Sequence, residues 1–196
     1  MDSIRHLVKE MVQYAQSTDC TKQKILFFGE FGGEEQMIRQ AKREDMDCIL
    51  GIVKVAKQYM KDTGNAAQWS GDYPGEADFK KDIDRRQLYV CYNEDGIYGI
   101  FAFLIGEEPN YVKIEDGQWL NDKPYGTIHR IAGNGKVKGV FQEAVDFAKE
   151  QMDDLRIDTH ADNRIMRYLI EKNGFQECGT IYVEDGTPRI AYQYTV

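Results

Sequence analysis

The stretch Tyr-Gly-Thr-Ile-His-Arg-Ile-Ala-Gly-Asn-Gly-Lys-Val-Lys-Gly-Val, residues 125–140, predicts a strand and a glycine-rich turn, and a helical pattern follows it to residue 149. Gly133, Gly135 and Gly139 interrupt the strand-forming residues, and apolar residues then recur at helical spacing. The first N–H groups of a helix have no partner within it, and the helix dipole favours negative charge there. The turn therefore suits an anion such as phosphate, although a tight strand-to-helix connection needs glycine with or without a ligand.

Length and composition limit the class of protein. The 196 residues, 42% hydrophobic and 12% aromatic, predict one folded domain with room for an appendage. The formal charge of −8 argues against nucleic acid as a partner, because binding to a phosphate backbone needs an excess of Lys and Arg. The same charge would suit a cationic substrate, and it also keeps many proteins soluble.

Metal and membrane binding are not predicted. The four cysteines and three histidines are scattered without the spacing of a zinc site, so we assign no metal ligands. The N-terminus lacks the basic-then-apolar pattern of a secretory signal, and the longest apolar run, 97–105, is too short to span a bilayer. We therefore expect a cytoplasmic protein without a membrane partner.

The chain divides near residue 36. Residues 1–36 are predicted to form an N-terminal extension, with an amphipathic helix over 3–15 and an apolar segment over 25–31. The extension either packs on the main domain or acts as an exchanged arm in a homodimer. Residues 37–196 are predicted to form a domain that could stand alone.

The order of elements within residues 37–196 predicts the fold class. A strand at 37–41 precedes two helices and three strands, the first two joined by an Asn93-Glu94-Asp95-Gly96 turn. A helix, a strand, a helix and two final strands follow. Hairpins make antiparallel pairs, whereas a helical crossover makes a parallel pair. The sequence therefore predicts an α+β fold, a mixed α/β sandwich whose mixed central sheet carries helices on both faces.

Three segments in this order resemble the GCN5-related N-acetyltransferases, the GNAT family, over residues 37–196. Residues 129–139 are similar to the segment that grips the pyrophosphate of acetyl-CoA. Residues 155–163 are similar to the family's fifth strand, which ends in an Asn that lies along the pantetheine arm. Residues 163–175 match the family's signature of Asn, short helix and Gly-Phe.

The resemblance implies an acyltransferase, an N-acetyltransferase that passes the acetyl group of acetyl-CoA to a primary amine. Direct attack in a ternary complex, without a metal, is the implied mechanism, and the acceptor is an unidentified small-molecule amine. Backbone N–H groups around Ile131 and Ala132 would stabilise the thioester oxygen as it gains charge. The residues implied to bind acetyl-CoA are Ile131, Ala132, Lys138, Gly139, Val140, Phe141 and Asn163.

Two departures from the family pattern leave an alternative open, a CoA-binding module with weakened catalysis and a sensing or partner-binding role. The family's phosphate loop reads Arg or Gln, two residues, Gly, one residue, then Gly or Ala. Starting this pattern at Lys138 puts Phe141 and Glu143 where small residues are expected. The Tyr that protonates the leaving thiolate in many members is replaced by Ile170, and Tyr168 lies about 200° away around the helix.

Acetyl transfer to an amine needs a base that removes a proton. Histidine titrates near neutral pH, so His129 on the central strand and His160 at the end of the next strand are candidates. Alternatively, His129 is a core histidine satisfied by a neighbour, and His160 is a solvated loop residue. Glu115 and Trp119 are candidates for contacting the acceptor, unless they are a solvated carboxylate and a packed ring. A regular strand would point Arg130 away from His129.

Overall fold

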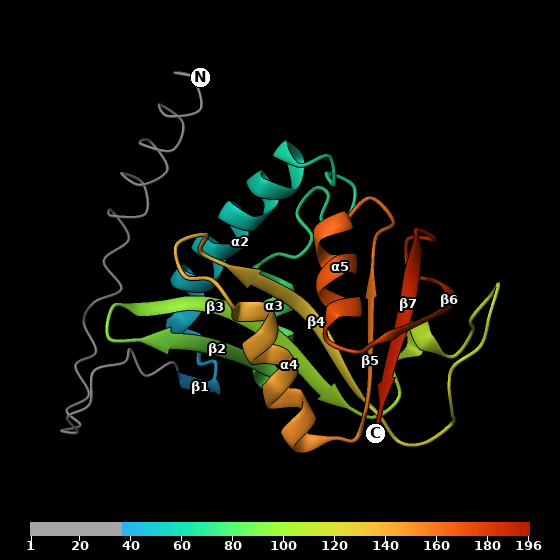
Figure 1. Cartoon of the computed structure of the whole chain (residues 1–196). Coiled ribbons are helices and arrows are strands. Elements are labelled where there is room, and N and C mark those ends of the chain that lie inside the picture. Colours follow the sequence, from blue (N-terminus) through green and yellow to red (C-terminus); the bar gives the residue numbers. More distant parts are fainter. Residues whose placement is uncertain (1–36) are drawn as a thin grey trace.

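A seven-stranded sheet runs through the molecule in the computed structural model, which describes residues 37–196 (Figure 1). The extension predicted over residues 1–36, with its helix, apolar segment and exchanged arm, lies outside the described residues. The strands are β1 (Met37–Gln40), β2 (Leu88–Asn93), β3 (Gly96–Ile105), β4 (Gly126–Gly133), β5 (Asp154–Thr159), β6 (Gln176–Tyr182) and β7 (Pro188–Thr195). The helices are η1 (Arg43–Asp45), α2 (Met46–Asp62), α3 (Glu76–Asp84), η2 (Pro109–Tyr111), α4 (Val140–Gln151) and α5 (Arg164–Lys172).

The sheet is mixed. Its strand order is β1-β2-β3-β4-β5-β7-β6, and every neighbouring pair is antiparallel except β4 and β5. Helix α4 lies between β4 and β5 in the chain, which is the crossover that a parallel pair requires. The predicted α+β fold and the predicted order of elements are confirmed.

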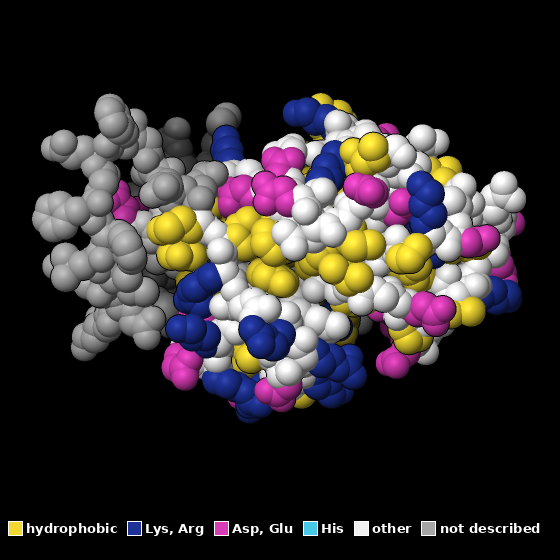
Figure 2. All heavy atoms as spheres, turned by 90° about the horizontal axis from the view of Figure 1, so that it is seen from below, with side chains coloured by type: hydrophobic (Ala, Val, Ile, Leu, Met, Phe, Trp, Pro, Cys, Tyr) yellow, Lys and Arg dark blue, Asp and Glu magenta, His cyan; other side chains and the backbone are white. Residues whose placement is uncertain are grey.

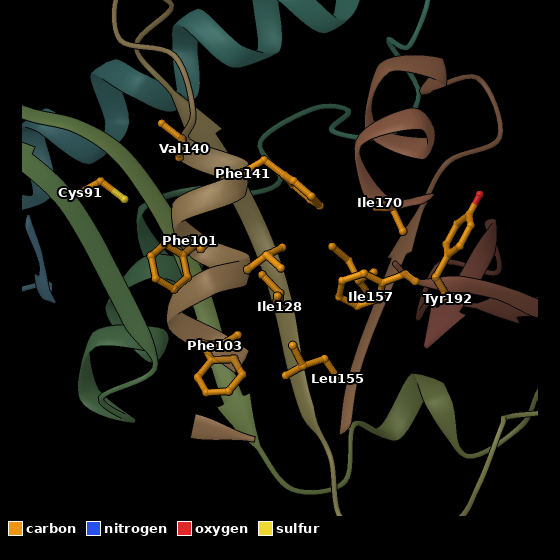
Figure 3. Packing of buried hydrophobic residues seen from close by; sticks show 14 of the residues in the cluster. Cys91, Phe101, Phe103, Ile128, Val140, Phe141, Leu155, Ile157, Ile170 and Tyr192 are labelled. Atoms are coloured by element: carbon orange, nitrogen blue, oxygen red, sulfur yellow. The ribbon is translucent and has the colours of Figure 1, made fainter. Parts of the chain in front are cut away.

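Helices cover both faces of the sheet (Figure 1). Helix α2 buries Met46, Ile49 and Val53, which share one helical face because they are three and four residues apart. Together with Phe79 of α3 they form the core on that side. On the other side, side chains of α4 and α5 meet those of the central strands (Figure 3). The central strands are therefore held in place by packing on both faces.

The two central strands pair only at one end. Gly126 opposes Leu155 and Thr127 opposes Arg156, and no further pair joins β4 to β5 within the described residues. On its other side, β4 stays paired with β3 as far as Gly133. Beyond Thr127, β4 and β5 therefore diverge, and the backbone groups on their facing edges need other partners.

A bulge in β4 lies just beyond the point of divergence. Arg130 has a φ of 51°, and the register with β3 shifts there. An extra residue in one strand bends that strand and disturbs the alternation of its side chains. The strand is therefore not regular at Arg130, and the alternation that would point Arg130 away from His129 does not apply there. Its guanidinium instead donates a hydrogen bond to Asp82 of α3.

The long connection between β3 and β4, residues 106–125, is fastened to the end of the sheet. Tyr111 and Tyr125 are buried against residues of β6 and β7. Glu115 makes an isolated antiparallel bridge with β6. At Gly117, a Cβ atom would overlap a backbone carbonyl of β6, so this close approach requires glycine. The connection is therefore held in a fixed position beside the divergence of β4 and β5.

Figure 2 shows one surface of the molecule, where both acidic and basic side chains border a band of apolar side chains. This face therefore does not present a field of a single sign. None of the helices in residues 37–196 is long and apolar enough to cross a bilayer.

Candidate functional site

The glycine-rich turn leads directly into the N-terminus of α4. Gly139 is the N-cap residue and has a φ of 101°, a left-handed conformation that glycine adopts without strain. The side-chain oxygen of Asn134 accepts hydrogen bonds from the backbone N–H groups of Lys136 (2.9 Å) and Val137 (3.2 Å), which shape the turn. Lys138 is exposed in the same turn. The exposed end of α4 thus presents N–H donors and the positive end of the helix dipole.

The position of Gly139 corrects the alignment of the phosphate loop. If the family pattern begins at Lys136 rather than Lys138, its Gly falls on Gly139, the left-handed N-cap of α4. Only Phe141 then occupies a position where a small residue is expected. Glu143 falls outside the pattern, which removes one of the two conflicts within the loop.

Phe141 and Glu143 are both engaged within the protein. Phe141 is buried in the core cluster and extends from α4 toward α5 in Figure 3. Glu143 accepts a hydrogen bond of 2.6 Å from the hydroxyl of Tyr98 on β3. Burial and this carboxylate raise the pKa of Tyr98 well above its ordinary value, so the hydroxyl remains a donor. One oxygen of the Glu143 carboxylate is therefore held against the sheet. The other, Oε1, is buried without a hydrogen-bond partner within residues 37–196 and lies beside Gly139.

Helix α5 provides Asn163 and Ile170. Asn163 is the N-cap of α5, where its side-chain oxygen accepts from the N–H of Met166 (3.1 Å) and its amide donates to Gln68 (2.9 Å). Ile170 is fully buried in the core, whereas Tyr168 is 63% exposed. Many GNAT members carry a Tyr at this position as the general acid. Here the position holds a packed aliphatic side chain, Ile170 (Figure 3).

His129 lies on β4 immediately before the bulge, between two carboxylates. Its Nε2 atom is 3.3 Å from Glu108 Oε2, and its Nδ1 atom is 3.7 Å from Asp158 Oδ1. The side chains of His129, Glu108 and Asp158 are 21%, 13% and 11% exposed. Glu108 precedes η2 and Asp158 lies on β5, so three separate segments form this cluster.

Both carboxylates are held by further hydrogen bonds. Glu108 Oε1 accepts from the side-chain amide of Asn110 (2.9 Å), and Asp158 Oδ1 accepts from the hydroxyl of Tyr111 (2.7 Å). Burial works to raise the pKa of Glu108, but His129 and Asn110 outweigh it, and the pKa lies below its usual value. Burial and Asp158 hold the pKa of Tyr111 far above its usual value. Glu108 therefore acts as an acceptor and Tyr111 as a donor.

A second ion pair lies beside the cluster. Arg130 Nη1 is 3.0 Å from Asp82 Oδ2 of α3, and the Arg130 guanidinium lies 5.8 Å from the ring centroid of Tyr73. Burial raises the pKa of Asp82, in spite of the opposing charge of Arg130. On the other side, Arg189 Nε of β7 is 3.9 Å from Asp158 Oδ2. The surroundings of His129 are therefore charged, and carboxylates outnumber guanidinium groups.

Within residues 37–196, no hydrogen bond or ion pair joins His160, Trp119 or Glu115 directly to Glu108, His129 or Asp158. His160 Nδ1 accepts from the N–H of Asp162 (3.2 Å), within its own loop. Trp119 donates to the Tyr111 carbonyl (3.0 Å) and lies 4.0 Å from the Arg156 guanidinium. Glu115 pairs with exposed Lys113. Ile131 and Ala132 follow the bulge on β4, where the strand faces the divergence.

Sequence reasoning missed Glu108, Tyr111 and Asp158. Asp158 carried a signal, because it is an acidic residue within a strand whose neighbours are mostly buried. Glu108 and Tyr111 carried none, since they come from the irregular connection at 106–125. Within residues 37–196, no group of three or more His, Cys, Asp or Glu is placed to hold a metal ion.

Several solved structures resemble this chain. A GNAT-family acetyltransferase from Streptococcus agalactiae is 30% identical, with a TM-score of 0.74, over 82% of this chain and 95% of that one. A Staphylococcus aureus protein described as an acetyltransferase is 29% identical, with a TM-score of 0.59, over 81% of this chain and 98% of that one.

A more distant likeness shows the fold alone. A Salmonella typhimurium protein described as an acetyltransferase with its cofactor acetyl-CoA is 14% identical, with a TM-score of 0.52, over 82% of this chain and 93% of that one. No protein-family model matches the chain, and no curated protein matches it.

Proposed function

Because the chain belongs to the GNAT family of acetyltransferases, we propose that it transfers the acetyl group of acetyl-CoA to the primary amine of a cationic small molecule. The amine attacks directly, in a ternary complex of protein, acetyl-CoA and acceptor. The cluster of Glu108, His129 and Asp158 at the divergence of β4 and β5 is the observation that carries this proposal.

The cluster has the chemistry that an ammonium acceptor needs. A primary amine is protonated at neutral pH and must lose a proton before it can act as a nucleophile. Three carboxylates surround His129 and two guanidinium groups face them, which leaves one negative charge uncompensated while His129 is neutral. These carboxylates would attract the ammonium group and would stabilise the imidazolium that forms when His129 takes its proton.

The elements around the cluster fit acetyl-CoA. The left-handed N-cap at Gly139 and the first N–H groups of α4 would hold the pyrophosphate. The facing edges of β4 and β5, left without strand partners, suit the amide groups of the pantetheine arm. The backbone N–H groups around Ile131 and Ala132 would stabilise the developing oxyanion. The description of the Salmonella typhimurium protein with acetyl-CoA supports this assignment.

Each proton that moves in the proposed transfer has a donor and an acceptor. His129 takes one proton from the ammonium, and the neutral amine attacks the thioester carbonyl, so that a C–N bond forms and the C–S bond breaks. The amine nitrogen loses a second proton as the product amide forms, and the departing thiolate takes up a proton from that nitrogen or from water. Ile170 offers no proton at this step, because it is an aliphatic side chain buried in the core.

The buried Ile170 also favours a second function, a CoA-binding module with weakened catalysis. Thiol release from acetyl-CoA, measured over a panel of polyamines, amino acids, aminoglycosides and N-terminal peptides, separates the two. We expect tight binding of acetyl-CoA by calorimetry, and release with at least one cationic amine. Binding without release over the whole panel would favour the module, and absence of binding would contradict both functions.

A further inference from the structure

We propose that Glu108 is a positioning residue: it fixes His129 as the tautomer that carries hydrogen on Nε2, and it leaves Nδ1 as the atom that accepts the acceptor's proton. The catalytic part of this inference rests on the proposed function. The tautomer itself is a property of the protein without ligand, and it can be measured separately.

The hydrogen on Nε2 follows from the chemistry of its partner. Neutral imidazole carries one N–H, and the other ring nitrogen has a lone pair. An ionised carboxylate accepts hydrogen bonds and cannot donate one. Glu108 Oε2 lies 3.3 Å from His129 Nε2, so a lone pair on Nε2 would face the lone pairs of the carboxylate. The contact is favourable only when Nε2 carries the hydrogen.

Glu108 is itself fixed in this orientation. Its Oε1 atom accepts from the backbone N–H (3.3 Å) and the side-chain amide (2.9 Å) of Asn110. Its backbone N–H donates to the hydroxyl of Tyr125 (3.1 Å). Because these bonds hold the residue from both ends, the second oxygen, Oε2, is directed at His129. The restraint comes from residues of the same connection, 106–125, and does not depend on a ligand.

Within residues 37–196, no hydrogen bond engages the other ring nitrogen, Nδ1. Asp158 Oδ1 is 3.7 Å from His129 Nδ1, which is beyond hydrogen-bond length. That oxygen already accepts the hydroxyl hydrogen of Tyr111 at 2.7 Å, so Tyr111 donates to the carboxylate and not to the ring. Nδ1 therefore keeps its lone pair. Once Nδ1 takes a proton, the new N–H lies near Asp158, which stabilises the imidazolium.

The tautomer is tested by long-range ¹H–¹⁵N correlation spectra of the full chain with ¹⁵N-labelled imidazole rings, recorded where the rings are neutral. The chain has three histidines, so spectra of His6→Gln and His160→Gln assign the remaining signals to His129. We expect a protonated-type Nε2 and an unprotonated-type Nδ1. Hydrogen on Nδ1 in the wild-type protein would overturn the proposal, and this readout needs no variant at position 108.

The role of Glu108 is tested by Glu108→Gln, whose amide can donate as well as accept. We expect the hydrogen to move largely to Nδ1, because the two Asn110 donors hold the amide oxygen and turn the amide nitrogen toward Nε2. The kcat for thiol release should then be about 10- to 100-fold lower at unchanged affinity for acetyl-CoA. Glu107→Gln is the matched control, because it removes the same charge from an exposed neighbour, and it should keep both the tautomer and the rate. An unchanged tautomer in Glu108→Gln overturns the proposal.

The two proposals fail separately. The spectra are recorded without acetyl-CoA, so a protein that shows the expected tautomer but releases no thiol would retain the positioning role and lose the proposed function. Thiol release by a protein with hydrogen on Nδ1 would retain the proposed function and overturn the positioning role of Glu108.

Discussion

The reactivity of a histidine is set by the groups that face its two ring nitrogens. His129 has Glu108 at 3.3 Å from one nitrogen and Asp158 at 3.7 Å from the other. His160 has partners only in its own loop within residues 37–196: the N–H of Asp162 donates to Nδ1, and the exposed Asp162 carboxylate lies 3.5 Å from the same atom. The two histidines that the sequence offered as bases are therefore distinguished by their neighbours, and the neighbours favour His129.

Replacing His129 with Gln should lower kcat for thiol release by about 10²- to 10⁴-fold, the usual contribution of a positioned base. The affinity for acetyl-CoA should stay unchanged, since no contact joins His129 to the α4 turn in the described chain. Steady-state kinetics and calorimetry measure the two effects. His160→Gln is the comparison and should keep the rate within a few-fold. A larger loss in His160→Gln than in His129→Gln would reverse the assignment.

Trp119 was predicted to contact the acceptor, but it packs against Arg156 and so serves the fold. The buried guanidinium of Arg156 lies between the rings of Trp119 (4.0 Å) and Tyr125 (3.9 Å) and donates to the Asn121 carbonyl (2.9 Å). Burial lowers its pKa, because removal from water disfavours the charged form. Trp119 is thus occupied by packing against a cation of the protein itself.

Arg156→Lys should lower the free energy of unfolding by about 2 kcal/mol, because an ammonium group cannot stack on both rings. Urea denaturation followed by fluorescence measures the loss. Arg164→Lys, at an exposed position of α5, is the matched control and should change little. Equal stabilities of the two variants would show that the stacked guanidinium contributes nothing.

At the scale of elements, the N-terminus of α4 combines a backbone requirement with an electrostatic one. Gly139 has a left-handed φ of 101°, which costs other residues about 1–2 kcal/mol. The helix dipole and the free N–H groups favour an anion at the same place. A side chain introduced at this position tests both requirements.

Gly139→Asn and Gly139→Asp form a matched pair. Both should lose similar stability, because the strain is the same and the side chains have almost the same size. Only the Asp variant places a negative charge where the pyrophosphate is proposed to bind, so its affinity for acetyl-CoA should be roughly 100-fold below that of the Asn variant. Calorimetry gives the two affinities. Equal affinities would refute the placement of the pyrophosphate at α4.

The corner between β1 and α2 depends on one buried carboxylate. Arg39 donates two hydrogen bonds to Asp45 (2.7 and 2.9 Å), and the N–H of Lys42 donates a third (2.8 Å). Burial works to raise the pKa of Asp45, but these bonds outweigh it, and the pKa lies below its usual value. A carboxyl group with a lowered pKa stabilises the fold above its unfolded pKa, and this contribution is lost as the pH falls through the folded value.

Asp45→Asn should therefore cost about 2 kcal/mol at pH 7, and the difference from wild type should shrink below about pH 4. Denaturant titrations at pH 7 and pH 3 measure it. Asp84→Asn is the control, because Asp84 pairs with Arg43 at an exposed site and should cost less than about 1 kcal/mol. A difference that stays constant between the two pH values would contradict the role of the ionised form.

At the scale of the whole molecule, the fold was predictable because its signals are local. Alternation of strands and helices, the hairpin turn at Asn93-Glu94-Asp95-Gly96 and the signature of Asn, short helix and Gly-Phe over residues 163–175 can each be read within a short window. The bulge at Arg130 cannot, because its residues are ordinary strand formers. The cluster at His129 cannot either, since the path of 106–125 decides which side chains meet it.

Three parts of the sequence prediction stay predictions: the acceptor, the cytoplasmic location and the homodimer through residues 1–36. The assignment of acetyl-CoA to α4, β4 and β5 depends on the family and on the geometry together, because Lys136 and Phe141 do not match the expected loop.

The two-residue pairing of β4 with β5 is the shortest strand pairing among residues 37–196, so we expect β1–β4 and β5–β7–β6 to behave as two cooperative units. Local opening can separate such units at a lower free energy than global unfolding requires. Native-state hydrogen exchange should therefore show the amides on the facing edges of β4 and β5 exchanging faster than those shared by β2 and β3. Saturating acetyl-CoA should slow the exchange of the amides on the facing edges of β4 and β5 alone. The bound substrate would then bridge the two strands, and the two units would open together.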